Sequence, residues 1–162
     1  MDSHKTRRDF VKQSTLIAGG LFATKLAGAN FFSGSDDVIK IALVGCGGRG
    51  TGAAIQALST KQNLKLVAMA DAFRDRLDDA YKTITTGGRD GSGAVNFKDK
   101  IDVPEERKFT GFDGYQKAIA LADVVILATP PGFRPLHFEE AINQNKHVFM
   151  EKPVATDPAG IL

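Results

Sequence analysis

The sequence has almost no cysteine, since Cys46 is the only one among its 162 residues. A single cysteine cannot form an intramolecular disulfide, which excludes a disulfide framework. Cys46 stands between two glycines of a glycine-rich segment, where we expect a small filler side chain rather than a nucleophile, because no activating base is nearby. The composition, 43% hydrophobic and 25% charged, excludes a disordered or collagen-like chain. The length allows one full domain.

The chain also has little net charge outside its N-terminus. The first 35 residues contain five Lys or Arg and two acidic residues, whereas the rest contains 16 basic and 17 acidic residues. The formal charge of +2 is therefore largely a property of the N-terminal segment. A nearly neutral body gives no support to a nucleic-acid or anionic-membrane partner, and we expect no nucleic acid to bind. The sequence also suggests no metal site.

The first 35 residues are interpreted as an export signal. The segment Thr6–Lys12 matches a twin-arginine signal, with paired arginines, a variable residue, an apolar pair and a lysine. The apolar run that follows, Ser14–Ala23, is too short to span a bilayer, and Ala27–Ala29 supplies a cleavage site. The alternative is an ordinary amphipathic helix with two chance arginines. We predict a partnership with the twin-arginine export machinery and a periplasmic location; an uncleaved leader that anchors the protein in the membrane remains an alternative.

Strands and helices alternate along the remaining chain. Runs of buried, β-branched residues predict strands, and amphipathic stretches predict helices. This alternation implies right-handed βαβ units and therefore an α/β fold, a Rossmann-type doubly wound parallel sheet of about five strands. The expected strands are 38–44, 64–70, 107–110, 124–129 and 147–150, and the expected helices are 52–58, 73–83, 115–121 and 135–144.

Two details of this interpretation concern faces and loops. A glycine-rich break at 87–93 is followed by residues 94–106, which show no clear period, so we expect a surface insertion there. In the helix expected at 135–144, Leu136 and Ile142 predict an apolar side, and Glu139 and Glu140 an acidic one.

The segment Gly45–Gly50 fits the GxGxxG pattern, which alone is a weak signal. Here it follows a predicted strand and precedes a predicted helix, and Asp71 stands 21 residues after Gly50 at the tip of the next strand. That context predicts a dinucleotide site. We expect Gly45 to permit the tight turn, Gly47 to let the backbone approach the pyrophosphate, and Gly50 to let the helix pack against the strand.

The acidic residue at the second strand bears on the choice of cofactor. A carboxylate at Asp71 can accept hydrogen bonds from both ribose hydroxyls and would repel a 2′-phosphate, which favours NAD. Arg74 leaves NADP open, because a guanidinium there can pair with that phosphate. The alternative for Asp71 is an N-cap for the helix that follows. The free N–H groups at the N-terminus of the first helix attract phosphate, and Arg49 is either solvated there or a phosphate contact.

The fourth strand ends at Thr129 and Pro130, at the carboxyl edge where ligands bind in open α/β sheets. These residues form either a wall beside the nicotinamide half of the cofactor or a structural turn. For His137, on the next helix, a packing or capping role is favoured over an acid–base role.

The fifth strand runs into Glu151, Lys152 and Pro153. A lysine at a strand end beside a cofactor can hold a substrate hydroxyl and shuttle its proton. Glu151 can orient that lysine, and Pro153 stiffens the exit, with a cis bond as one means. The alternative is a surface Glu–Lys pair before a turn.

Taken together, these motifs resemble those of the Gfo/Idh/MocA family, the relatives of glucose-fructose oxidoreductase and inositol dehydrogenase. The resemblance implies hydride transfer between NAD(P) and a hydroxyl carbon of a sugar, polyol or related compound, with Lys152 as the catalytic residue. The matching pieces are GCGGRG at 45–50, MAD at 69–71, VVILATPP at 124–131 and KHVFMEKPVA at 146–155. The expected cofactor contacts are Gly45, Cys46, Gly47, Gly48, Arg49, Gly50, Asp71, Arg74, Thr129, Pro130, Glu151 and Lys152.

The sequence departs from that family at its end. Members carry a second α/β domain that supplies the substrate wall, further catalytic residues and often the oligomer interface, whereas this sequence ends at Leu162. We therefore expect a Rossmann domain over 36–162 that is incomplete at its C-terminus, with no turnover by itself and homo-oligomers only with the missing domain. An NAD-dependent glycosidase and a non-catalytic dinucleotide-binding module are the alternative functions.

Overall fold

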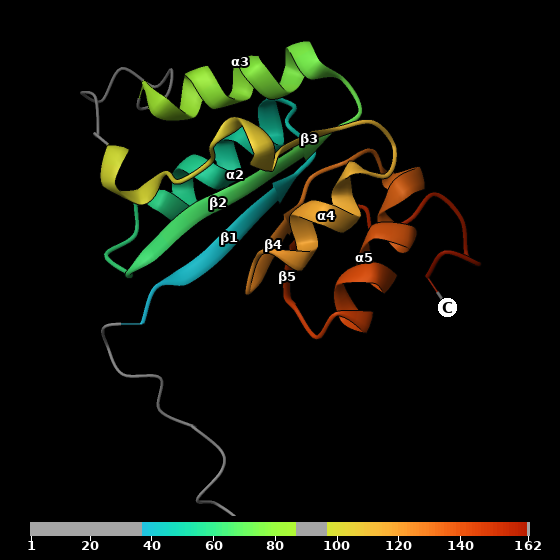
Figure 1. Cartoon of the computed structure of the whole chain (residues 1–162). Coiled ribbons are helices and arrows are strands. Elements are labelled where there is room, and N and C mark those ends of the chain that lie inside the picture. Colours follow the sequence, from blue (N-terminus) through green and yellow to red (C-terminus); the bar gives the residue numbers. More distant parts are fainter. Residues whose placement is uncertain (1–36, 87–96, 162) are drawn as a thin grey trace, which may run out of the picture. The chain divides into compact units, whose positions relative to one another are not determined.

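Five parallel strands form the sheet of this protein, and their order is β3-β2-β1-β4-β5 (Figure 1). The computed structural model describes residues 37–86 and 97–161. The strands are β1 (Ile39–Val44), β2 (Leu64–Asp71), β3 (Lys108–Thr110), β4 (Val124–Leu127) and β5 (His147–Met150). All five lie within two residues of the predicted ranges, and the predicted Rossmann-type parallel sheet is confirmed.

The strand order reverses at β1, which pairs with β2 on one side and with β4 on the other. Its residues from Ile41 to Val44 are buried, as the apolar run predicts for a central parallel strand. In open α/β sheets the ligand lies beyond the carboxyl ends of the strands at such a reversal. The residues after β1 and β4 are therefore placed where a cofactor is expected.

Helices cover both faces of the sheet (Figure 1). On one face, α2 (Gly48–Leu58) and α3 (Arg74–Thr85) pack on side chains such as Leu43, Leu66 and Met69. On the other face, α4 (Gly114–Ala120) and α5 (Arg134–Asn143) pack on a layer rich in alanine. Fully burying one such Leu or Met side chain contributes about 1.5–3 kcal/mol, so these two apolar layers supply most of the stabilisation. Three short 3₁₀ helices complete the described chain: η2 (Lys98–Lys100), η3 (Glu105–Arg107) and η4 (Pro131–Phe133).

The segment expected to be a surface insertion is in part a piece of the core. Residues 87–96 lie outside the described residues, but Phe97 is only 2% exposed and Val103 is also buried. Ile101 forms a bridge with Leu66 of β2. The prediction is therefore wrong for Phe97 and Val103, which belong to the core. An irregular segment buries single apolar residues without any period, so pattern analysis does not detect it.

The exposed face of α5 also differs from the prediction. Leu136 and Ile142 are 53% and 50% exposed, whereas the buried residues are Arg134, His137 and Ala141. Their spacing of three and four residues is the helical period of a buried face. The apolar side was misassigned because two polar side chains occupy the inner face.

The helix α2 begins four residues before the predicted start, inside the glycine segment. The predicted leader, residues 1–35, lies outside the described residues. Over the ranges that are described, no helix combines the length and the apolar character needed to cross a membrane.

Candidate functional site

Three glycines shape the turn between β1 and α2. Gly45 has a φ of +96°, and a Cβ there would lie 2.6 Å from the backbone nitrogen of Thr129. A Cβ at Gly50 would overlap the carbonyl oxygen of Gly45, whereas a Cβ at Gly47 would meet nothing within 4 Å. The tight turn at Gly45 and the close packing at Gly50 are therefore confirmed. The open space at Gly47 suits close approach of a phosphate.

Backbone hydrogen bonds fasten this turn to the end of β2. The N–H of Gly45 donates to the carbonyl oxygen of Ala70 at 2.9 Å, and the N–H of Cys46 donates to Oδ2 of Asp71 at 2.7 Å. The Cys46 side chain is buried, and its burial, reinforced by the nearby Asp71 charge, raises the pKa of the thiol. A thiol that stays protonated is a filler and not a nucleophile, as expected.

Asp71 uses both carboxylate oxygens within the backbone of the site. Besides the bond to Cys46, its Oδ1 accepts a hydrogen bond from the N–H of Phe73 at 3.0 Å. The N-cap of α3 is Phe73 itself, without a side-chain hydrogen bond, so Asp71 closes the turn before α3 and does not cap the helix. Each carboxylate oxygen keeps a lone pair, because such an oxygen accepts two hydrogen bonds. The expected role of Asp71 toward a ribose remains compatible with this geometry.

A cavity of about 610 Å³ lies over this turn, at the carboxyl edge of the sheet. One end is formed by Asp71, Ala72 and Phe73, and the other by Thr129 and Pro130, with the glycine turn between them. This volume is within the usual range for sites that take small molecules and cofactors. The remaining lining residues are Val44, Gly45, Gly47, Ala70, Arg76, Gly111, Phe112, Tyr115, Ala128, Phe133, Arg134 and His137.

His137 supports the end of the cavity that contains Thr129. Its Nδ1 lies 3.0 Å from Oγ1 of Thr129, and its ring lies against that of Tyr115 with the centroids 4.2 Å apart. Burial lowers the pKa of His137 to about 4, so the imidazole is neutral at physiological pH. These contacts agree with the favoured packing role.

The segment after β5 is joined to the glycine turn by an ion pair. Glu151 is only 7% exposed, and its Oε1 lies 2.8 Å from Nε of Arg49 in the first turn of α2. Pairing with this carboxylate raises the pKa of Arg49. Glu151 therefore pairs with Arg49, and its expected role in orienting Lys152 stays a prediction. The pair forms because the sheet brings the ends of β1 and β5 to the same edge.

Lys152 is exposed and does not line the cavity. Its peptide bond to Pro153 is cis, which was one of the options for this exit. The structure thus places the candidate catalytic lysine at the carboxyl edge, directly after the residue that contacts Arg49, and leaves its amine to solvent.

Arg134 is a site residue that the sequence analysis missed. Its side chain is buried, with 5% exposed, and its Nη1 donates to the carbonyl oxygens of Glu151 and Pro153. It therefore holds the backbone on both sides of Lys152. The signal for it was its spacing, three residues before His137 on the inner face of α5. An arginine is normally assigned to the outside, and for that reason it was not selected.

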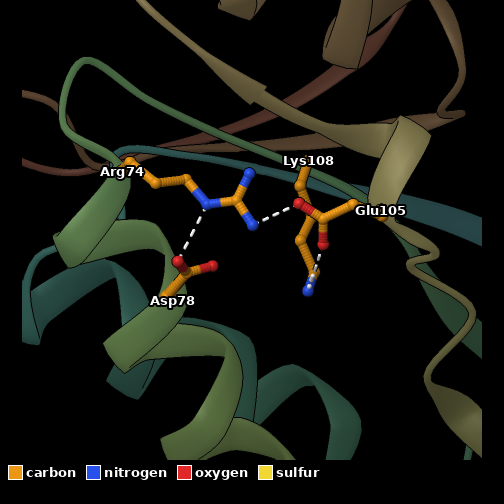
Figure 2. A network of polar contacts seen from close by, with 4 residues as sticks. All are labelled: Arg74, Asp78, Glu105 and Lys108. Atoms are coloured by element: carbon orange, nitrogen blue, oxygen red, sulfur yellow. Dashed lines mark hydrogen bonds and ion pairs between the residues drawn. The ribbon is translucent and has the colours of Figure 1, made fainter.

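Arg74 is occupied by protein carboxylates and is absent from the cavity lining. Its Nε lies 2.8 Å from Oδ2 of Asp78, and its Nη2 pairs with Glu105 (Figure 2). Arg76 lines the cavity in its place. In the part of the chain that is described, no group of three or more His, Cys, Asp or Glu residues could hold a metal ion.

Comparisons with known proteins agree with this geometry. The family model described as an oxidoreductase family with an NAD-binding Rossmann fold, Gfo/Idh/MocA, matches residues 39–161. Scyllo-inositol dehydrogenase from Lactobacillus casei, solved with NAD(H) and scyllo-inositol, is 28% identical, with a TM-score of 0.54 over 77% of this chain and 31% of that one. No curated protein sequence gives a significant match.

Two further solved structures are similar. The WlbA dehydrogenase from Bordetella pertussis, in complex with NADH and UDP-GlcNAcA, is 26% identical, with a TM-score of 0.53 over 78% of this chain and 30% of that one. Myo-inositol dehydrogenase from Lactobacillus casei, at 17% identity and a TM-score of 0.56, shares the fold over 76% of this chain and 31% of its own. The present chain therefore spans about a third of the length of these dehydrogenases.

The close packing at Gly50 can be tested by adding one methyl group. Gly50→Ala should lower the free energy of unfolding by more than about 2 kcal/mol, because its Cβ would overlap the backbone of the turn. Gly52→Ala is the matched control in the same helix, since its Cβ would meet nothing within 4 Å, and it should raise stability by up to about 1 kcal/mol. Urea denaturation gives both values, and an equal effect of the two substitutions would contradict the packing role.

The buried His137 predicts a dependence of stability on pH. The imidazole of the unfolded chain titrates near pH 6.5, and that of the folded chain near 4. Between these values only the unfolded state binds the proton. The contribution of His137 therefore lowers the free energy of unfolding as pH drops from about 6.5 to 4, and it has no effect above that window. We expect His137→Gln to remove about 1–2 kcal/mol of this loss, a figure reduced because the cavity admits water.

The measurement is urea denaturation at pH 7 and pH 4.5 for wild type and variant. His147→Gln, on an exposed position of β5, is the control and should keep the wild-type dependence. If His137→Gln leaves the pH dependence unchanged, the folded imidazole is not the neutral, buried group described above.

Proposed function

The chain belongs to the Gfo/Idh/MocA oxidoreductase family and contains its NAD-binding Rossmann domain, and from this we propose the activity of the whole protein. We propose that the protein transfers a hydride between NAD and a hydroxyl carbon of a sugar, polyol or related compound. Two similar dehydrogenases, 28% and 26% identical to this chain over the matched region, were solved with scyllo-inositol and with UDP-GlcNAcA. Those substrate classes support the proposed one.

The observation that carries the proposal is the ion pair between Arg49 and Glu151. It joins the glycine turn, which suits a pyrophosphate, to the segment that contains Lys152. A phosphate-binding turn and an amine that can handle a proton thus belong to one edge of the sheet. That combination suits oxidation of an alcohol better than simple nucleotide binding.

The residues of the cavity suit three parts of NAD. The N–H groups at the start of α2 and the open backbone at Gly47 are suited to the pyrophosphate, and the free lone pairs of Asp71 to the ribose hydroxyls. Thr129 and Pro130 line the other end of the cavity and are proposed as a wall beside the nicotinamide half. When bound, oxidised NAD would accept the hydride.

Lys152 is proposed as the residue that accepts the substrate proton. As the alcohol becomes a carbonyl, the O–H bond of the hydroxyl breaks, and the amine of Lys152 is proposed to take the proton. Arg134 is proposed to position it, because it binds the carbonyl groups before and after Lys152. The buried guanidinium of Arg134 holds this backbone in place, while the amine of Lys152 stays exposed.

The location of the protein is proposed from its leader. The paired arginines Arg7 and Arg8 support export through the twin-arginine machinery, and the neutral body gives no reason for retention on nucleic acid or anionic lipid. A leader left uncleaved would anchor the protein in the membrane.

The proposed activity predicts a separation between cofactor binding and turnover. In the complete protein that carries this domain, Lys152→Met should reduce polyol-dependent NADH formation at least about a hundredfold. The affinity for NAD, measured by calorimetry on the same variant, should change less than about twofold, because Lys152 does not line the cavity. Lys146→Met, at a half-buried lysine just before β5 that is absent from the cavity lining, is the control and should affect neither quantity.

Three results would contradict the proposal in different ways. Turnover that survives Lys152→Met shows that the lysine is not catalytic. NAD binding without oxidation of any sugar or polyol by the wild-type protein indicates a non-catalytic binding module, and release of nitrophenol from aryl glycosides indicates the glycosidase.

Export is tested with the charge-preserving variant Arg7→Lys/Arg8→Lys. We expect the variant to remain in the cytoplasm, because the twin-arginine signal requires the arginines themselves and not their charge. Fractionation of cells into periplasm, membrane and cytoplasm gives the distribution. Lys5→Arg is the control and should be exported like wild type; equal export of the double variant overturns the assignment.

A further inference from the structure

An ion network surrounds Arg74, near the start of α3 (Figure 2). Arg74 is the first residue of α3, three positions after Asp71. Its guanidinium binds two carboxylates, that of Asp78 one turn along α3 and that of Glu105 in η3. Both hydrogen bonds raise the pKa of Arg74. The guanidinium is therefore engaged on the side where α3 faces the segment before β3.

The carboxylate of Glu105 is itself held in place. Lys108 of β3 lies 3.1 Å from Oε2 of Glu105 by its Nζ, and the same ammonium group sits 3.9 Å from the centre of the Tyr81 ring. The hydrogen bond from Arg74, followed by that from Lys108, lowers the pKa of Glu105. The carboxylate of Glu105 thus has two cationic partners, Arg74 and Lys108, that hold it in place.

The first turn of α3 contains two arginines with different surroundings. Arg76 lines the cavity that contains Asp71 and also a second hollow, of about 530 Å³, between α2 and α3. Arg74 lines neither of them. The network therefore removes from the ribose end the arginine that stands nearest to Asp71 in the sequence.

We propose that Asp78 and Glu105 set the preference for NAD over NADP by holding Arg74 away from the position of a 2′-phosphate. The inference concerns the cofactor site alone and goes beyond the proposed activity. Asp71 disfavours the phosphate by direct repulsion, and the two further carboxylates withhold the guanidinium that would compensate for it. A free arginine binds phosphate through paired N–H groups, so its removal from the site has a large effect on discrimination.

The network can be dismantled without unfolding the protein. Arg74, Asp78 and Glu105 are all about half exposed or more, and exposed ion pairs contribute little to stability. Asp78→Asn/Glu105→Gln keeps the shape of both side chains while removing their charges. Arg74 then has only neutral partners and is free to turn toward a phosphate beside Asp71.

The test measures the dissociation constants of NAD and NADP by calorimetry on the 162-residue chain. We expect Asp78→Asn/Glu105→Gln to bind NADP about five- to tenfold more tightly than wild type, with NAD changed less than about twofold. Adding Arg74→Gln to this variant should abolish the gain. The matched control is Asp75→Asn/Glu106→Gln, which removes two neighbouring charges outside the network and should give less than about a twofold gain.

Three outcomes overturn the inference. An unchanged affinity for NADP shows that Arg74 does not reach the phosphate. A gain in NADP affinity that persists with Arg74→Gln shows that Arg76 binds the phosphate. An equal gain in the control variant shows that the loss of negative surface charge causes the gain. Failure of the wild-type chain to bind NAD contradicts the cofactor site as a whole and hence the proposed function as well, whereas a failure of selectivity alone leaves that function untouched.

Discussion

The site depends on the close approach of α2 to the turn that follows β1. No Cβ fits at Gly50 without overlapping the carbonyl of Gly45, and none fits at Gly45 beside the backbone of Thr129. The ends of β1 and β4 and the start of α2 are therefore brought together by the absence of side chains. This approach places the start of α2, whose positive dipole end suits phosphate, directly after the glycine turn that lines the cavity, and it also fixes where Arg49 stands.

Arginines on that frame have three different tasks. Arg49, mostly exposed, ties the buried carboxylate of Glu151 to the turn, and Arg134, mostly buried, binds the backbone around Lys152. Arg74 is half exposed, and its guanidinium pairs with the carboxylates of Asp78 and Glu105. An arginine side chain can thus join two segments, hold a stretch of backbone, or be kept away from the cofactor site, depending on its burial and on the acceptors around it.

The sequence was sufficient to predict the structure where a short pattern of residues is compatible with one local structure only. Apolar runs predicted β1, β2 and β4, the less buried edge strands β3 and β5 were also predicted, and the glycine spacing predicted the turn and its packing at Gly45 and Gly50. It was insufficient where contacts join distant segments. The pairing of Glu151 with Arg49 crosses about a hundred residues, and the clamp by Arg134 needs a buried cation that no pattern of apolar residues marks. Phe97 likewise enters the core from an irregular segment, where no period exists to be detected.

The distribution of buried and exposed charge connects these points to function. Around Lys152 the charged contacts are buried or bridge to a buried partner, and removing one partner of such a contact leaves a costly unpaired group. Around Arg74 the charges are exposed and individually weak, so substitutions there change affinity more readily than stability. Under the proposed function, the segment that contains Lys152 is thus held by buried contacts, while the proposed determinants of cofactor preference are exposed contacts that single substitutions can alter. We propose that the domain in this way fixes the position of Lys152 and leaves the cofactor preference adjustable.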